Sequence, residues 1–376
     1  MDIKPFGVEM WMNEFETKCA FNLAETCVAS ITLGELFEMA GGRDGILDEL
    51  ADTRMTYGAI EGSDRLRRAI AGLYERQSPD TILTTHGTIG ANALVHHALV
   101  SRGDHVISVV PTYQQHYSIP ESIGAEVELL HLRPDQNFLP DLDELRGMVR
   151  ADTTLIAINN PNNPTGSLMD RDRLAAIADI ARGAGAWLLC DEVYRGTDQA
   201  GAGFTAAVAD LYEKGISTAG MSKAYSLAGL RVGWIAAPRD VLERVMIHRD
   251  YNTISVGTVD ELFAAVALEH RDTILARAHR LTRHNLQILR AWMDRERLLT
   301  WVPPRSGTTA LIKYDLPVTS RDFCVALLEE EGVMLTPGSA MDMEGWVRLG
   351  FANPTEDLEL GLARLSAFLS RRKKTA

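Results

Sequence analysis

The residues best suited to covalent chemistry lie in the segment 217–233, STAGMSKAYSLAGLRVG. Lys223 in this segment follows a predicted buried strand and has small neighbours, a setting that should strip water from its amine. Loss of water favours the neutral form of a lysine, and a neutral amine is the nucleophile that forms a Schiff base with a carbonyl group. Taken alone, Lys223 fits an ordinary solvated loop lysine better, so other residues must decide.

Polar residues at the ends of other predicted strands supply partners for this amine. Asp191 closes the apolar run 186–192, and Tyr194 follows it three positions later. Asn163 follows another strand, and Thr88 lies in HGTIGAN at a predicted helix N-terminus, where backbone N–H groups bind phosphate. The carboxyl ends of parallel strands meet at one ligand-binding edge of a sheet. A phosphate site, an acid for a pyridine-type nitrogen and a lysine for a carbonyl together describe pyridoxal phosphate.

The elements that must position these residues alternate between helix and strand from about residue 63. Apolar residues at helical spacing predict helices, and short β-branched apolar runs predict strands. The predicted helices are 63–76, 91–100 and 171–185, and the predicted strands are 81–85, 105–110, 126–132, 154–160, 186–192, 215–220 and 231–237. Several strands are hydrophobic on both faces, which predicts an α/β fold with a parallel sheet between helical layers.

The pattern changes after about residue 240, which predicts a second and smaller α+β domain. A long helical stretch, interrupted at Gly257, leads into it without a flexible linker. Its predicted strands are 308–314, 332–337 and 345–351, and its predicted helices are 321–331 and 355–372.

Composition excludes several classes of protein. The chain has 376 residues, of which 46% are hydrophobic and 24% charged, so it is neither disordered nor of low complexity. Its net charge of −13 argues against binding to nucleic acid or to an anionic membrane. The four scattered cysteines indicate free thiols, and no signal peptide or membrane-spanning run is present. We therefore expect a soluble cytoplasmic protein.

Other catalytic motifs are missing from the sequence. It contains no G-x-x-x-x-G-K-[ST] phosphate loop, no G-x-S-x-G nucleophile elbow and no G-x-G-x-x-G dinucleotide fingerprint after a strand. The histidines never take the spacing of H-E-x-x-H or of another zinc site, so we expect no metal site.

Seven motifs in a fixed order give the sequence a family resemblance. They are MTYGAIEGSDRLRRAIA, HGTIGAN, PTY, NNPNNPTG, DEVY, SKAYSLAGLRVG and VRLGFA, and they run from Tyr57 to Arg348. Together they resemble the class I/II aminotransferases, a family of fold-type-I enzymes that depend on pyridoxal phosphate. The resemblance implies a large domain with a mostly parallel seven-stranded sheet over 46–280, and a small α+β domain over 281–376. The segment 1–45 is expected to contribute to the small domain and to cover the active site.

The resemblance assigns roles around the cofactor ring. Lys223 resembles the lysine that holds the cofactor and later moves the proton on the substrate α-carbon. Asp191 would pair with the pyridine nitrogen, and Asn163 and Tyr194 would donate to the phenolic oxygen of the ring. Tyr113, in PTY, would stack on the ring face; taken by itself it is an ordinary tyrosine.

The resemblance also assigns the phosphate and substrate ends of the site. The residues expected around the phosphate are Gly87, Thr88, Ile89, Ser222 and Arg231. Tyr57 resembles the tyrosine that reaches the phosphate from a partner subunit, which implies a homodimer with shared sites. Arg348 resembles the arginine that binds the substrate α-carboxylate through two hydrogen bonds, with Asn163 beside it.

The N-terminal segment departs from the family pattern. Much of the family carries a glycine-rich run there, whereas this chain has FNLAETCVASITLGEL. Glu9 and Glu25 are candidate substrate-binding residues that would face a cationic side chain, although solvated surface carboxylates are the simpler interpretation. His86, just before the phosphate turn, has no assigned role.

Three functions remain open. The first is an aminotransferase that acts on an L-amino acid, with a polar or basic side chain, and a keto acid, through an external aldimine and a quinonoid. The second resembles capreomycidine-synthase-like enzymes, in which a hydroxylated basic amino acid loses a β or γ substituent and can cyclise. The third is an aminotransferase-like sensor that regulates transcription, but no basic DNA-binding region precedes Tyr57.

Overall fold

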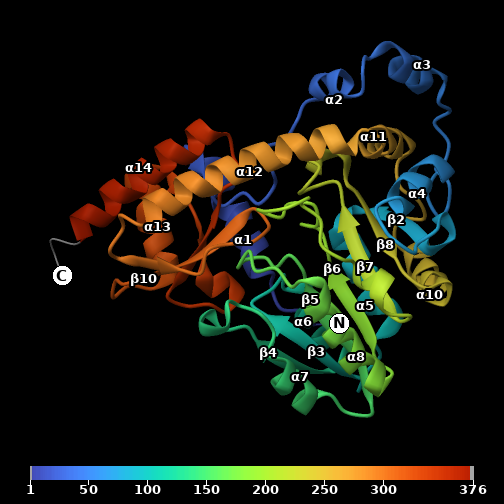
Figure 1. Ribbon diagram of the computed structural model, residues 1–376, viewed down its shortest axis with the longest axis horizontal. Coiled ribbons are helices and arrows are strands. Elements are labelled where there is room, and N and C mark those ends of the chain that lie inside the picture. Colours follow the sequence, from blue (N-terminus) through green and yellow to red (C-terminus); the bar gives the residue numbers. More distant parts are fainter. Residues whose placement is uncertain (1, 373–376) are drawn as a thin grey trace.

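The computed structural model describes residues 2–372, and its largest element is a seven-stranded sheet (Figure 1). The strands are β2 (Ile82–His86), β3 (His105–Val110), β4 (Glu126–His131), β5 (Thr153–Asn159), β6 (Trp187–Asp191), β7 (Gly215–Gly220) and β8 (Val232–Ala236). Their order is β2-β8-β7-β6-β5-β3-β4, and only β8 runs antiparallel to its neighbours. The expected seven-stranded, mostly parallel sheet is confirmed.

Neighbouring residues along a strand face opposite layers of helices, which explains why these strands are apolar on both faces. Leu155 and Leu189 pack in one core with α5 and α10, while Ile156 and Leu188 pack in another with α7 and α8. The helices of this part are α4 (Asp64–Ala71), α5 (Gly87–Leu99), α6 (Gln115–Ile123), α7 (Leu142–Met148), α8 (Arg171–Ala184), α9 (Val208–Leu211), α10 (Arg239–Asp250), α11 (Thr258–Glu269) and α12 (Arg271–Met293). Burial on both sides fixes the sheet and therefore the positions of its carboxyl ends.

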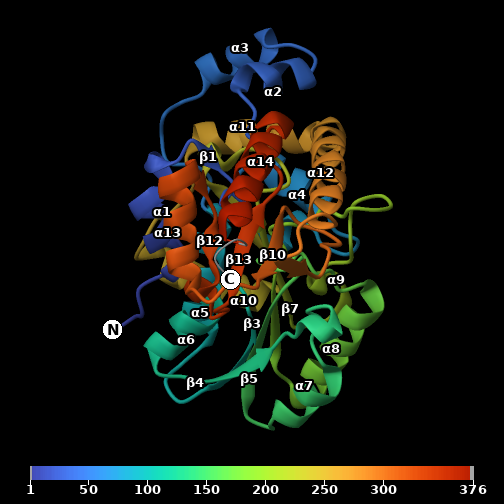
Figure 2. The same ribbon diagram turned by 90° about the vertical axis from the view of Figure 1, so that its left-hand side faces the viewer.

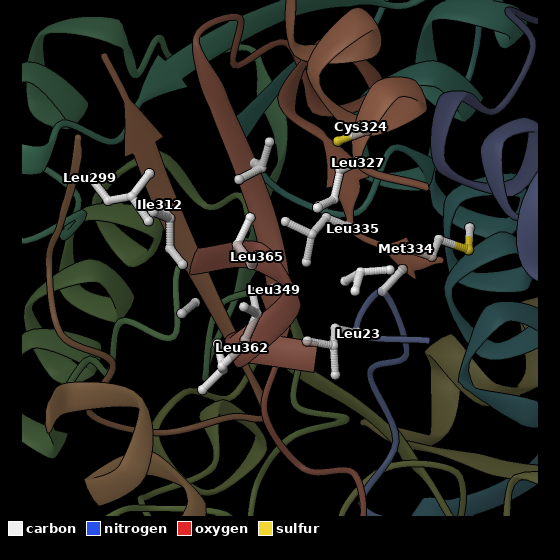
Figure 3. Close-up of a cluster of buried hydrophobic side chains, with 14 of the residues drawn as sticks. Leu23, Leu299, Ile312, Cys324, Leu327, Met334, Leu335, Leu349, Leu362 and Leu365 are labelled. Carbon is white, nitrogen blue, oxygen red and sulfur yellow. The ribbon is translucent and has the colours of Figure 1, made fainter. Parts of the chain in front are cut away.

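A smaller four-stranded sheet lies in the C-terminal part of the chain. Its order is β12-β13-β10-β9, and its strands pair antiparallel. The elements are β9 (Leu299–Trp301), β10 (Thr309–Tyr314), α13 (Ser320–Glu331), β11 (Val333–Met334), β12 (Thr336–Pro337), β13 (Trp346–Gly350) and α14 (Thr355–Arg372). The sheet, α13 and α14 enclose one apolar core, in which Leu23 of the N-terminal segment packs with Leu349 and Leu362 (Figure 3).

Residues 2–52 contact both parts of the protein. They form α1 (Gly7–Phe15), a 3₁₀ turn (Glu16–Lys18), β1 (Phe21–Asn22), α2 (Leu33–Met39) and α3 (Asp44–Asp52). β1 pairs in parallel with β11, which attaches the N-terminal segment to the C-terminal part. Both ribbon views show α2 and α3 standing away from the rest of the molecule (Figures 1 and 2).

The predicted domain boundary at residue 280 falls inside α12, a continuous helix of 23 residues. The division of the chain into 1–45, 46–280 and 281–376 therefore stays a prediction, with a rigid helix rather than a loop at the second boundary. Within residues 2–372, none of the helices combines the length and the apolar character that crossing a bilayer requires.

Candidate active site

A cavity of about 340 Å³ opens at the carboxyl ends of the central strands. Its walls come from these strand ends, from α1 and the segment 24–27, and from β13. The predicted site residues that line it are Glu9, Glu25, Thr88, Ile89, Tyr113, Asn163, Asp191, Tyr194, Ser222, Lys223, Arg231 and Arg348. The structure thus gathers residues from both ends and the middle of the sequence around one space.

Asp191 ends β6 at the base of this cavity and is 3% exposed. Its carboxylate accepts hydrogen bonds from Asn92 Nδ2 at 2.8 Å and from the backbone N–H of Val193 at 3.0 Å. His116 Nε2 lies 3.6 Å from the same carboxylate, and Asn92 is itself fixed by the hydroxyl of Thr218, which donates to Asn92 Oδ1. Asp191 is therefore a rigid buried acceptor that points at the cavity.

Lys223 donates from Nζ to Thr26 Oγ1 at 2.6 Å, and its Nζ lies 3.4 Å from Cys27 Sγ. Burial lowers the pKa of Lys223, but its neighbours Cys27, Tyr194 and Glu25 together outweigh burial and raise the pKa above its ordinary value. These neighbours oppose the neutral amine that the sequence favoured, and the charge of Lys223 stays a prediction. The sequence shows the small neighbours of Lys223, but it does not show the acidic and polar groups that packing brings to it.

Glu25 is the carboxylate that matters most for this charge balance. Burial alone would raise its pKa, but Lys223 and the backbone N–H groups of Cys27 and Thr26 lower the pKa below its ordinary value. Those two N–H groups donate to Glu25 Oε1 at 2.7 and 2.6 Å. Glu25 is therefore held as an anion by its own loop and by the lysine, rather than solvated at the surface.

The first turn of α5 forms a cradle for an anion. Gly87 has a φ of +67°, and a Cβ at this position would lie 2.9 Å from Arg231 Nη2, so glycine lets the arginine approach the helix start. Thr88 is 7% exposed, and its Oγ1 has no hydrogen-bond partner within residues 2–372. Ser222 and Arg231 line the same end of the cavity. A helix N-terminus, an unpartnered hydroxyl and a guanidinium fit a phosphate group.

Arg348 projects from β13 and is 3% exposed. Its guanidinium donates to Asn163 Oδ1 at 3.3 Å, to the carbonyl oxygen of Ala24 at 3.1 Å and to Thr336 Oγ1 at 3.0 Å. Burial lowers the pKa of Arg348, although acidic neighbours oppose the change. Its Nε is buried and has no partner among the described residues.

Three residues that the sequence placed at or near the site do not line the cavity. Gly87 contributes indirectly, because its lack of a side chain lets Arg231 approach it closely. Tyr57 is 77% exposed, so its predicted contact with a phosphate needs a partner subunit and stays a prediction. His86 ends β2 directly before α5, and its Nδ1 is buried without a partner in the described part of the chain.

Several residues at the site had not been predicted. Asn92 lies four residues after Thr88, on the same face of α5, so helical spacing from Thr88 would have found it. Thr26 and Cys27 contact Lys223 across almost 200 residues, and no local pattern signals such a contact. Glu16 and Met12, which line the cavity beside Glu9, were not predicted for the same reason.

Comparison with known proteins fits this geometry. The family model for aminotransferases of class I and II matches residues 43–365. The chain belongs to this family. Pyridoxal phosphate is the cofactor of the family, so the predicted family, fold and cofactor are confirmed and the chain is a pyridoxal-phosphate-dependent enzyme.

The relatives of this aminotransferase-family enzyme include both transferases and cyclases. Capreomycidine synthase of Streptomyces vinaceus is 32% identical over 360 residues, which cover 96% of this chain and 92% of that protein. A PLP-dependent aminotransferase from Streptococcus suis is 42% identical, with a TM-score of 0.96 over 99% of both chains. The PLP-dependent cyclase OrfR is 30% identical, with a TM-score of 0.92 over 99% of this chain and 98% of that one.

Proposed function

We propose that the protein is an aminotransferase that moves the amino group of an L-amino acid to a keto acid, as a homodimer with shared active sites. One observation carries this proposal: Lys223 and Arg348 face the same cavity, so one amino acid can present its amine to the first and its carboxylate to the second. The match of the chain to the aminotransferase family over 43–365 supports it.

We assign the cofactor-binding roles to the residues at the carboxyl ends of the large sheet. Lys223 would bind the aldehyde, and Asp191 would keep the pyridine nitrogen protonated through its buried carboxylate. Thr88, Ser222 and Arg231 would bind the phosphate. Bound pyridoxal phosphate accepts electron density from the substrate α-carbon when its proton leaves.

The ring oxygen and the ring face would be held by residues beside the lysine. Asn163 Oδ1 already accepts from Arg348, which leaves its Nδ2 to donate to the phenolic oxygen. Tyr194 is 2% exposed beside Lys223, and its hydroxyl would donate to the same oxygen. Tyr113 would cover the ring face.

The proton on the α-carbon would be moved by Lys223 after substrate binding releases its amine. Thr26 Oγ1 accepts a hydrogen bond from that amine at 2.6 Å, so the hydroxyl would orient the nitrogen towards the α-carbon. Arg348 would hold the carboxylate in place during the transfer. Thr26 is thus a positioning residue, and Lys223 is the catalytic base and acid.

A spectral and product assay tests this function. The holoenzyme is mixed with single amino acids, then with pyruvate or 2-oxoglutarate, and keto-acid exchange is measured while the cofactor absorbance is followed. Clean bleaching to the amine form of the cofactor, together with keto-acid exchange, is expected. Borohydride reduction and peptide mapping should place the cofactor on Lys223. No exchange with any amino acid, or a tag on another residue, would reject the proposal.

A second candidate is elimination or cyclisation of a hydroxylated basic amino acid. It is favoured by the similarity to capreomycidine synthase over 96% of this chain and by the substitution of the usual glycine-rich run with LAETCV. In this case the substrate would lose water, a long-wavelength absorbance band would persist, and no keto-acid exchange would occur. The same assay therefore separates the two functions.

A further inference from the structure

The active-site cavity holds more acidic than basic side chains. Its basic residues are Lys223, Arg231 and Arg348, and its acidic residues are Glu9, Glu16, Glu25 and Asp191. Because buried charges are costly unless they are paired or meet a ligand of opposite charge, the buried groups of this set need a partner, whereas Glu16 lies at an exposed position.

This inference rests on the proposed function, under which five of the seven groups have a partner. Lys223, Arg231 and Asp191 would bind the cofactor, and Arg348 would bind the α-carboxylate. Glu25 accepts two backbone N–H groups and lies near Lys223. Glu9 and Glu16 remain. Within residues 2–372 neither of them forms an ion pair.

Glu9 and Glu16 lie on one face of the first helix and of the turn that continues it. They are seven residues apart, which is about two helical turns, and Met12 between them also lines the cavity. By contrast Glu14 does not line the cavity, and it pairs with Arg321 at 2.9 Å. α1 and the 3₁₀ turn after it therefore present one stripe, with an acid at each end, to the cavity.

Tyr113 fixes the nearer acid of this stripe. Its hydroxyl donates to Glu9 Oε1 at 3.0 Å. Burial, followed by the influence of Glu9, raises the pKa of Tyr113. The phenol therefore stays neutral, and its hydrogen bond orients the Glu9 carboxylate without balancing its charge. One oxygen of Glu9 is thus oriented, and the other is left for a donor in the cavity.

The opposite end of the cavity points independently to a ligand. Arg348 is 3% exposed, and its Nε has no partner among the described residues. Glu9 and Arg348 both line this cavity, and Glu9 opposes the lowering of the pKa of Arg348. A substrate bound by its carboxylate at Arg348 and by its amine at Lys223 would extend its side chain into this space.

We propose that the substrate is an amino acid with a cationic side chain, a guanidinium or an ammonium group, which binds the carboxylates of Glu9 on α1 and of Glu16 in the 3₁₀ turn that follows it. The Met12 side chain between them would cover the methylene groups of the substrate. Glu9 is the main determinant of specificity because Tyr113 orients it.

The test compares substrates of similar shape and different charge. The holoenzyme is assayed with arginine against citrulline, which replaces the guanidinium by a neutral ureido group, and with lysine against norleucine. Turnover is followed by consumption of the amino acid, which detects transfer and elimination alike. We expect kcat/KM to be at least about tenfold higher for each cationic member of a pair.

The variant Glu9→Gln keeps an acceptor for Tyr113 and removes the charge. It should lower kcat/KM for arginine by about tenfold, mainly through KM, and leave citrulline within about twofold. The matched control Glu14→Gln, on the same helix but outside the cavity, should leave both values unchanged. Equal use of arginine and citrulline by the wild type, or an equal loss on both in Glu9→Gln, would overturn the inference while the proposed function stands. Loss of turnover on every amino acid would instead reject the proposed function.

Discussion

The two ends of the active-site cavity are built in different ways. The cofactor end, defined by Thr88, Asp191, Ser222, Lys223 and Arg231, comes from the carboxyl ends of strands of the large sheet and from the loops that follow them. The substrate wall, defined by Glu9, Glu16, Thr26 and Arg348, combines the N-terminal segment with a strand near the C-terminus. Under the proposed function, the chemistry would depend on one sheet, and the choice of substrate would depend on segments that only tertiary packing brings together.

The hydrogen bonding of the two ends differs accordingly. Asp191 at the cofactor end is fixed by Asn92 and Val193, and Thr218 fixes Asn92 in turn. At the substrate wall, Tyr113 is the donor to the Glu9 carboxylate, and Glu16 lies at an exposed position. Changes at the cofactor end should therefore abolish the reaction, whereas changes at the substrate wall should alter which amino acid reacts and how fast.

The largest effect is expected from Lys223→Ala. Without the amine, both attachment of the cofactor and movement of the α-proton are lost, and kcat should fall by about 10⁴-fold or more. The measurement is steady-state keto-acid formation with saturating cofactor. Lys313→Ala, at an exposed position on β10, serves as the control and should keep wild-type activity. Comparable activity in the two variants would remove Lys223 from the mechanism.

Arg348→Lys should give the next largest effect. A lysine keeps the charge but loses the planar fork that binds a carboxylate through two hydrogen bonds. KM for the amino acid should rise by about 30- to 100-fold, with a smaller change in kcat. The corresponding amine without a carboxylate provides the control, because its turnover should be equal in both enzymes. An unchanged KM would mean that the carboxylate binds elsewhere.

Thr26→Val tests the residue of the substrate wall that contacts Lys223 at the cofactor end. Loss of the hydroxyl that accepts from Lys223 should lower kcat by about tenfold and change KM little, since a hydrogen bond to a charged group contributes about 1.5–3 kcal/mol. The pH profile of kcat should shift as well, because the amine loses a partner. Thr26→Ser restores the hydroxyl and should restore both kcat and the profile. Failure of this rescue would show that the methyl group, and not the hydroxyl, matters.

The smallest effect on activity is expected from Glu192→Gln, next to Asp191. The Glu192 side chain accepts from Ser217 and from the backbone N–H of Val208, away from the cavity, and burial raises its pKa to about 7. The folded-state pKa of Glu192 lies above the ordinary value of 4.5. Its contribution to the free energy of unfolding is therefore complete below pH 4.5 and is lost as the pH rises to about 7. That loss amounts to at most about 3 kcal/mol.

Urea unfolding of wild type and Glu192→Gln at pH 5 and pH 8 measures this contribution. The neutral amide cannot ionise, so the variant should lose less stability between the two pH values, while its kcat at pH 7 stays within about twofold of wild type. An equal pH dependence in both proteins would place the pKa of Glu192 near its ordinary value.

The sequence predicted which residues gather at the cofactor end of the cavity, because their signals are local. An apolar run followed by Asp191, and a lysine in a small-residue loop after a strand, need only strand ends to bring them together. It did not reveal the groups that raise the pKa of Lys223, because Cys27 and Glu25 lie almost 200 residues from the lysine in the sequence. Glu16 and Cys27 were missed for the same reason, and Arg348 was found only through the family resemblance.

Strand β1 and its continuation have one further consequence. Leu23 accepts a backbone hydrogen bond from Gly350, Ala29 donates one to Ala352, and the Thr308 hydroxyl donates to the carbonyl oxygen of Thr26. The threonine that touches the reactive amine and the arginine for the carboxylate are thereby tied into a single mechanical unit. Under the proposed function, the hydroxyl that orients the base and the guanidinium that receives the acid group of the substrate would therefore keep a fixed separation.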